Sequence, residues 1–168
     1  MSLDSMRDLL VRELRDLYSA GTMVLKALPA MASVVTSRPL RHLLADHSRE
    51  TELQLDRLET IFDTLEADPW GQRCRGMEGL VDDSVALLTE EGDQAVREAA
   101  IAAEALRIGH YLIAGYNSAC RHARHLWLDT VLEPLAQSLG EVQAATALLT
   151  TMAEHQIQSP PLAEAAGG

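Results

Sequence analysis

Apolar residues in this chain recur three and four positions apart along four long segments, which is the period of an amphipathic α-helix. The first stripe consists of Leu10, Leu14, Leu17, Gly21, Val24, Leu28 and Met31. Aromatic residues make up only 4% of the 168 residues, and such a composition favours helices over strands. No segment reads as a strand, a phosphate-binding loop or a nucleophile elbow. We therefore expect an all-α protein.

Turn and helix-breaking residues divide the chain into four long helices and one short helix. The first helix ends before a break at 36–39, and the others are expected at about 39–65, 77–90 (the short one), 93–125 and 128–155. Pro29 and Pro134 are expected to loosen or interrupt their helices. Together these helices predict an antiparallel four-helix bundle with one additional short helix. The domain is expected at 1–158, followed by a flexible C-terminal tail at 159–168.

The charge of the chain argues against two classes of partner. The net charge is −11, from 14 basic and 25 acidic residues. Nucleic acids and anionic membranes both require a basic face, so we expect neither as a partner. No apolar run reaches the roughly 18 residues needed to span a bilayer, and the first residues, MSLDSMRDLL, lack the pattern of a signal peptide. We expect a cytoplasmic protein.

Five stretches stand in an order known from one protein family. They are ELRDLYSA, LKALPAMA, ETELQLDRLETIF, CRGMEGLVDD and GHYLIAGY, between Glu13 and Tyr116. In these stretches the chain resembles the YciE/YciF family of ferritin-like, stress-associated bacterial proteins. The resemblance implies a ferritin-like four-helix bundle and a homodimer. It identifies no other partner.

Ferritin-like bundles commonly hold two metal ions between inward carboxylates and histidines. The resemblance implies where such ligands would stand, and most of these positions carry none here. The positions of the lost ligands are Gly21, Gly109, Leu112 and Val142. Glu50 is retained, His47 precedes it on the same helix, and His110 is a third vestigial candidate. We expect no cofactor and a packed apolar centre in place of the ions.

Three functions remain open from the sequence. The first, which we favour, is a non-enzymatic stress-associated protein with a degenerate di-metal site. The second is an iron- or manganese-dependent oxidoreductase with a shifted set of ligands. The residues available to it are Glu50, His47, His110 and either Glu13 or Glu141. The third is a module that binds a partner or a small apolar ligand, since Gly21 and Gly109 remove side-chain volume from the bundle centre.

For a few polar residues the sequence leaves both a functional and a purely structural role open. Glu50 is either a metal ligand, a paired buried acid or an exposed residue. Cys74 lies between two arginines, whose charge lowers the pKa of a thiol, so it is either a reactive thiol or an ordinary loop cysteine. His122 and His125 lie three positions apart, which suits either a metal ion or a solvated helix end.

Two tryptophans and two acidic pairs complete the candidates. Trp70 and Trp127 are expected to cover the ends of the bundle or to form a subunit contact. The acidic pairs at 82–83 and 90–91 are expected on solvated faces.

Overall fold

The computed structural model describes residues 4–158, with side chains through Glu154, so the tail expected at 159–168 lies outside the described residues. Five helices follow one another in this part of the chain. Their bounds are α1 Met6–Val34, α2 Arg38–Thr64, α3 Arg75–Leu88, α4 Gln94–His125 and α5 Asp129–Gln158. The prediction of an all-α bundle with one additional short helix is confirmed.

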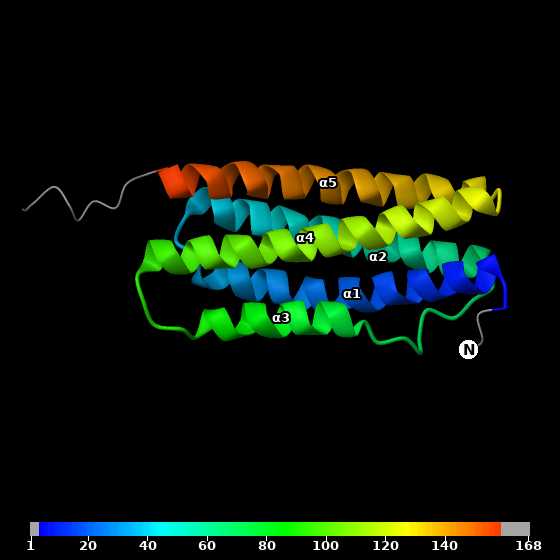
Figure 1. Cartoon of the computed structure of the whole chain (residues 1–168), viewed down its shortest axis with the longest axis horizontal. Coiled ribbons are helices and arrows are strands. Elements are labelled where there is room, and N and C mark those ends of the chain that lie inside the picture. Colours follow the sequence, from blue (N-terminus) through cyan, green and yellow to red (C-terminus); the bar gives the residue numbers. More distant parts are fainter. Residues whose placement is uncertain (1–3, 159–168) are drawn as a thin grey trace, which may run out of the picture.

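The four long helices form the bundle, and α3 lies along its outside (Figure 1). Helix α1 packs against α2 and α4, and α5 packs against the same two helices. Adjacent helices run in opposite directions around the bundle. Helix α3 packs on α1 and α4 and forms part of the long connection from α2 to α4. This connection runs back along the bundle, as in ferritin-like folds.

Local side chains account for where two of the helices begin. The hydroxyl oxygen of Ser5 accepts a hydrogen bond from the backbone N–H of Asp8 at the start of α1, and Asp93 accepts two backbone N–H groups at the start of α4. Such caps satisfy amide groups that have no partner within the helix. The interruption expected at Pro134 is wrong, because α5 continues through it while packing on α4 and α2.

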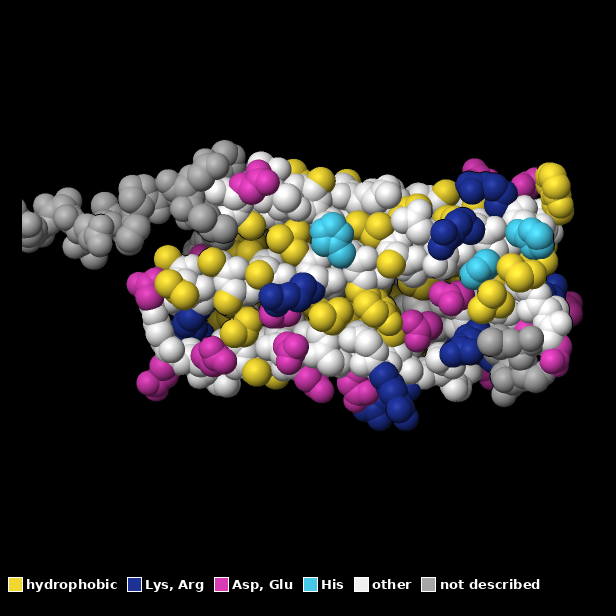
Figure 2. All heavy atoms as spheres, viewed as in Figure 1, with side chains coloured by type: hydrophobic (Ala, Val, Ile, Leu, Met, Phe, Trp, Pro, Cys, Tyr) yellow, Lys and Arg dark blue, Asp and Glu magenta, His cyan; other side chains and the backbone are white. Residues whose placement is uncertain are grey.

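The core lies between the four long helices. Every residue of the first predicted stripe is buried in α1. Opposite it, α4 contributes residues such as Ile101, Ile108 and Leu112, and α5 contributes Val131, Val142 and Leu149. Charged side chains are spread over the face that Figure 2 shows, whereas Glu98 and Glu104 are buried. No described helix has the length and hydropathy of a membrane span.

Candidate metal centre in the bundle core

The positions of the lost ligands are packed. A Cβ atom at Gly21 would lie 2.9 Å from Cδ2 of Leu55, and one at Gly109 would overlap Oγ1 of Thr146. Leu112 and Val142 are themselves buried core residues. The space that the glycines leave is therefore taken by side chains of α2 and α5. The apolar void on which the small-ligand hypothesis depended is not present at these two positions.

Helix α2 carries the buried polar residues of the centre. His47, Thr51 and Gln54 are each at most 2% exposed. Neither ring nitrogen of His47 has a hydrogen-bond partner among the described residues. Burial lowers the pKa of His47 to about 4, which keeps the imidazole neutral at physiological pH. A neutral imidazole can bind a metal ion, but no carboxylate orients this one.

Glu50 lies on the rim of this centre. Its side chain is partly exposed and makes no hydrogen bond with the described part of the chain. Burial raises its pKa, and the negative charges of Glu141 and Asp46 add to the shift. The buried residue between His47 and Gln54 on α2 is Thr51, the neighbour of Glu50. Glu50 is therefore a partly buried acid without an ion pair among the described residues, and it lies between the paired buried acid and the exposed residue expected from the sequence.

Glu141 is neutralised by an arginine. Arg57 on α2 donates two hydrogen bonds to its carboxylate, of 2.6 and 2.8 Å. Gln54 and Gln137 each donate a further one. Burial by itself raises the pKa of Glu141, but these hydrogen bonds outweigh it and hold the pKa below its usual value. Arg57 also donates to the hydroxyl of Ser138, so one guanidinium ties α2 to α5.

The other two members of the shifted ligand set lie apart from His47. His110 is exposed on α4, so its proposed place in an interior site is wrong. Glu13 lines a surface groove between α1 and α4, together with Asp16 and Tyr111. Among the side chains that the structure describes, no three His, Cys, Asp or Glu residues form a group that could hold a metal ion.

A polar cluster that the sequence did not predict surrounds Cys74. Its Sγ lies 3.1 Å from Oδ2 of Asp16 and 3.1 Å from the hydroxyl oxygen of Tyr111. Its backbone N–H donates to the hydroxyl of Ser19. A Cβ at Gly76 would lie 2.6 Å from the same tyrosine oxygen, so this approach requires glycine. The cluster fastens the start of α3 onto α1 and α4.

Of the two alternatives for Cys74, the structure does not support the reactive thiol. The residue is fully buried, and burial raises the pKa of its thiol. The hydrogen bond with Tyr111 lowers the pKa by a smaller amount, and Asp16 raises it. One of the flanking arginines, Arg73, pairs with Glu78 rather than with the sulfur. The thiol therefore lacks the electropositive surroundings of a reactive cysteine.

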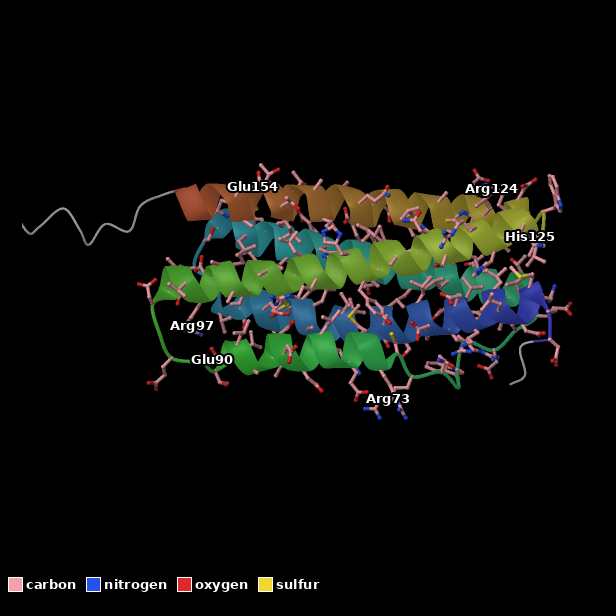
Figure 3. All side chains as sticks on the ribbon, in the orientation of Figure 1. Arg73, Glu90, Arg97, Arg124, His125 and Glu154 are labelled. Carbon is pink, nitrogen blue, oxygen red and sulfur yellow. The ribbon has the colours of Figure 1, made fainter. Side chains whose placement is uncertain are left out.

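The end of α4 carries exposed basic and aromatic side chains. Arg124 and His125 lie at the end of the bundle where α4 meets α5 (Figure 3). Trp127 follows them and is 88% exposed, so the expectation that it covers the bundle end is wrong. Trp70 packs edge-on against Tyr18, with ring centroids 5.4 Å apart, and is also largely exposed. His122 and His125 belong to the last turn of the helix, where positive charge is favourable.

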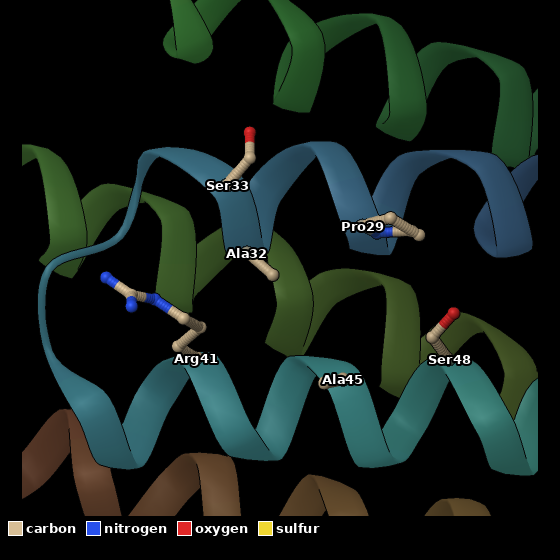
Figure 4. A pocket seen from close by; sticks show the side chains of 6 residues that line it. All are labelled: Pro29, Ala32, Ser33, Arg41, Ala45 and Ser48. Atoms are coloured by element: carbon tan, nitrogen blue, oxygen red, sulfur yellow. The ribbon is translucent and has the colours of Figure 1, made fainter.

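A surface pocket between α1 and α2 offers little chemistry (Figure 4). It is lined by Pro29, Ala32, Ser33, Arg41, Ala45 and Ser48. Its only charged group, the Arg41 guanidinium, donates to the backbone oxygen of Val35. The residues that line the pocket include neither a nucleophile with a base nor a group of metal ligands.

Comparison with known proteins identifies the family of the chain. The family described as a domain of unknown function, DUF892, matches residues 5–160. Protein YciF of Escherichia coli K12 is 27% identical over 158 residues, covering 94% of this chain and 95% of YciF.

Solved structures are similar over most of the chain. The crystal structure of the E. coli stress protein YciF has a TM-score of 0.88 at 26% identity, covering 92% of this chain and 98% of that one. YcfI from Rhodopseudomonas palustris, described as a proposed structural protein, has a TM-score of 0.85 at 36% identity, with 89% and 96% covered.

Proposed function

This chain belongs to the DUF892 family, and we propose that it is a non-enzymatic, stress-associated ferritin-like protein whose di-metal site has been lost. A cytoplasmic location and a homodimer, expected from the sequence and the resemblance, are part of this proposal. Stress association is supported by the similarity to YciF, which is described as a stress protein in E. coli.

The proposal rests on one observation. Packed side chains and the guanidinium of Arg57 stand where a di-metal site would have its ligands and ions. Leu55 and Thr146 fill the space beside Gly21 and Gly109. The carboxylate of Glu141, which would otherwise be a candidate ligand, is held by the guanidinium of Arg57. An arginine in this place balances the charge without an ion and makes two directed hydrogen bonds.

The donor groups of the core do not fit a di-metal centre. Such a centre takes about four to six carboxylate or imidazole ligands from four helices. Here the described core offers the neutral imidazole of His47, while Glu50 stands on the rim and Glu141 is paired. Two further buried carboxylates already have partners: Glu98 accepts hydrogen bonds from Thr36, Ser37 and Gln94, and Glu104 pairs with Arg107. We therefore do not favour an iron- or manganese-dependent oxidoreductase.

Metal analysis of the untagged protein tests the proposal directly. After growth with added iron, manganese and zinc, we expect below about 0.1 ion per chain, because too few deprotonated ligands converge to bind one. The same metals added to the purified protein should not raise its melting temperature, since a ligand stabilises only the state that binds it. A content near one or two ions per chain would overturn the proposal.

Restoration of the lost ligands provides the complementary test. The variant combines Gly21→Glu, Gly109→Glu and Val142→Glu with the space-making changes Leu55→Ala and Thr146→Ala. We expect it to gain stability on addition of ferrous or manganous ions, because carboxylates bind these ions. The matched control carries glutamine at the same three positions and should show no gain. A folded glutamate variant without a gain would contradict the inferred positions of the lost ligands.

A further inference from the structure

Charge is strongly separated along the second half of the chain. Residues 76–96 contain six acidic side chains and no Lys, Arg or His. Residues 105–128 contain three arginines and three histidines and no acid. The first segment forms most of α3 and the start of α4, and the second continues α4 to its end. Arg124 and His125 lie at one end of the bundle and Glu90 toward the other (Figure 3).

Two exposed surfaces follow from this separation. The basic end consists of Arg121, Arg124, His125 and Trp127. The acidic face consists of Asp82, Asp83, Val85, Glu90 and Glu91. Within the described residues, none of the four acids forms an ion pair, and neither do the two arginines. The charges of both surfaces are therefore not paired in any ion pair of the described residues.

Trp127 is the most unusual residue of the basic end. Its backbone φ is +57°, and Leu128 N–H donates to Ala123 O while Trp127 N–H donates to Arg124 O. This pattern closes a helix with a left-handed residue, a position that favours glycine and penalises a bulky side chain. Its indole is also 88% exposed. Neither backbone conformation nor burial accounts for a tryptophan at this position.

The acidic face supplies a matching surface. Helix α3 buries Met77 and Ser84 against the bundle, which leaves Asp82, Asp83 and Val85 exposed on the outside. Val85 is 47% exposed and adjoins these carboxylates, so it offers an apolar contact within an acidic surface. A tryptophan flanked by arginines suits such a surface, because aromatic and arginine side chains provide most anchors of protein interfaces.

We propose that the basic end of one copy of this protein docks on the acidic face of a second copy, with Trp127 packed against Val85. In a two-fold symmetric dimer, the basic end of each copy would meet the acidic face of the other. Each dimer would then contain two equivalent contacts, each with one Trp127 as its anchor. Asp129, beside Trp127 in sequence, is an exposed acid next to the basic end and reduces its net charge. The contact specifies the homodimer of the proposed function and does not depend on the loss of the metal site.

Sedimentation velocity of the full chain tests the contact. We expect a dimer at about 0.03 M salt that weakens at about 1 M salt, where the Debye length is about 3 Å. Trp127→Gly should weaken dimerisation at least tenfold while keeping the fold, because glycine suits the left-handed position. Leu148→Ser is the control, since Leu148 is exposed on α5 outside both surfaces. A wild-type monomer, or a Trp127→Gly variant that dimerises like wild type, would overturn the proposal.

A charge exchange identifies the two surfaces. One variant carries Arg121→Glu and Arg124→Glu, and the other carries Asp82→Arg, Asp83→Arg, Glu90→Arg and Glu91→Arg, which reverses all four acids of the acidic face. Each alone should be monomeric, because two surfaces of like charge then face each other. An equimolar mixture should form a heterodimer, in which both contacts are again of opposite charge. A mixture that stays monomeric contradicts the assigned pairing, whereas the metal content of the protein bears only on the proposed function.

Discussion

Substitution of His47 by leucine tests how the bundle responds to acid. His47 is 1% exposed, and neither ring nitrogen has a hydrogen-bond partner in the described structure. An unpaired buried polar group costs about 1–3 kcal/mol, so His47→Leu should be neutral or stabilising near neutral pH. Leucine also removes a buried group that gains a charge as the pH falls.

The pH dependence follows from the difference between two pKa values. Burial lowers the pKa of His47 from its ordinary value of 6.5 to about 4 in the folded protein. Below pH 6.5 the unfolded state binds a proton that the folded state rejects, so stability falls as the pH is lowered through this range. The linkage relation gives a loss of about 2.5 kcal/mol between about pH 7.5 and about pH 4.5. Below a pH of about 4 this contribution becomes constant.

Urea unfolding at the two pH values measures this contribution. Other groups also titrate, so the informative quantity is the pH-dependent loss in wild type minus that in His47→Leu. We expect a difference of about 2.5 kcal/mol. His110→Gln, which changes an exposed histidine, serves as the control and should behave like wild type. An equal loss in wild type and His47→Leu would refute a buried neutral imidazole at this position.

Three further substitutions test other contacts. Gly109→Ala should destabilise the protein by about 1–3 kcal/mol, because the new Cβ meets the side chain of Thr146. In a Thr146→Ala background the same substitution should instead stabilise the protein by about 0.5–1 kcal/mol, because alanine has the higher helix propensity. Urea unfolding of both variants measures this change of sign. Arg57→Leu should raise the pKa of Glu141 and cost about 1–2 kcal/mol at neutral pH, and a cost that persists in a Glu141→Gln background would contradict the ion pair. Measured by calorimetry at about 1 M salt, where the proposed dimer contact is weakened, Trp127→Gly should raise the stability of the single chain by about 1 kcal/mol, and a lower melting temperature under that condition would argue against strain at its φ of +57°.

Much of the fold could be predicted because it depends on local spacing. The stripe from Leu10 to Met31 predicted which face of α1 is buried. Asp93 follows a glycine and precedes a long periodic segment, and it caps α4. These features involve residues within one or two helical turns of each other, so the pattern along the chain contains the information.

The candidate metal centre was only partly predictable. Glu50 was expected to be a retained ligand of the centre, whereas the structure buries the next residue, Thr51, and leaves Glu50 on the rim. A shift of one residue rotates a helix face by about 100°. When the candidate face of a helix contains both polar and apolar residues, the helical period alone does not determine which residues face the core. The packing of α2 between α1 and α5 determines this.

The sequence by itself determined the helices, their order and the absence of ligands at Gly21 and Gly109. Only the tertiary structure decided what stands in their place, which is Leu55 from α2 and Thr146 from α5. Likewise, Cys74 meets Asp16 and Tyr111, 58 and 37 residues away, only after α3 docks on α1 and α4. Contacts between distant residues depend on how whole helices pack together. The periodicity of one helix predicts its buried face but not which residues of the other helices that face contacts.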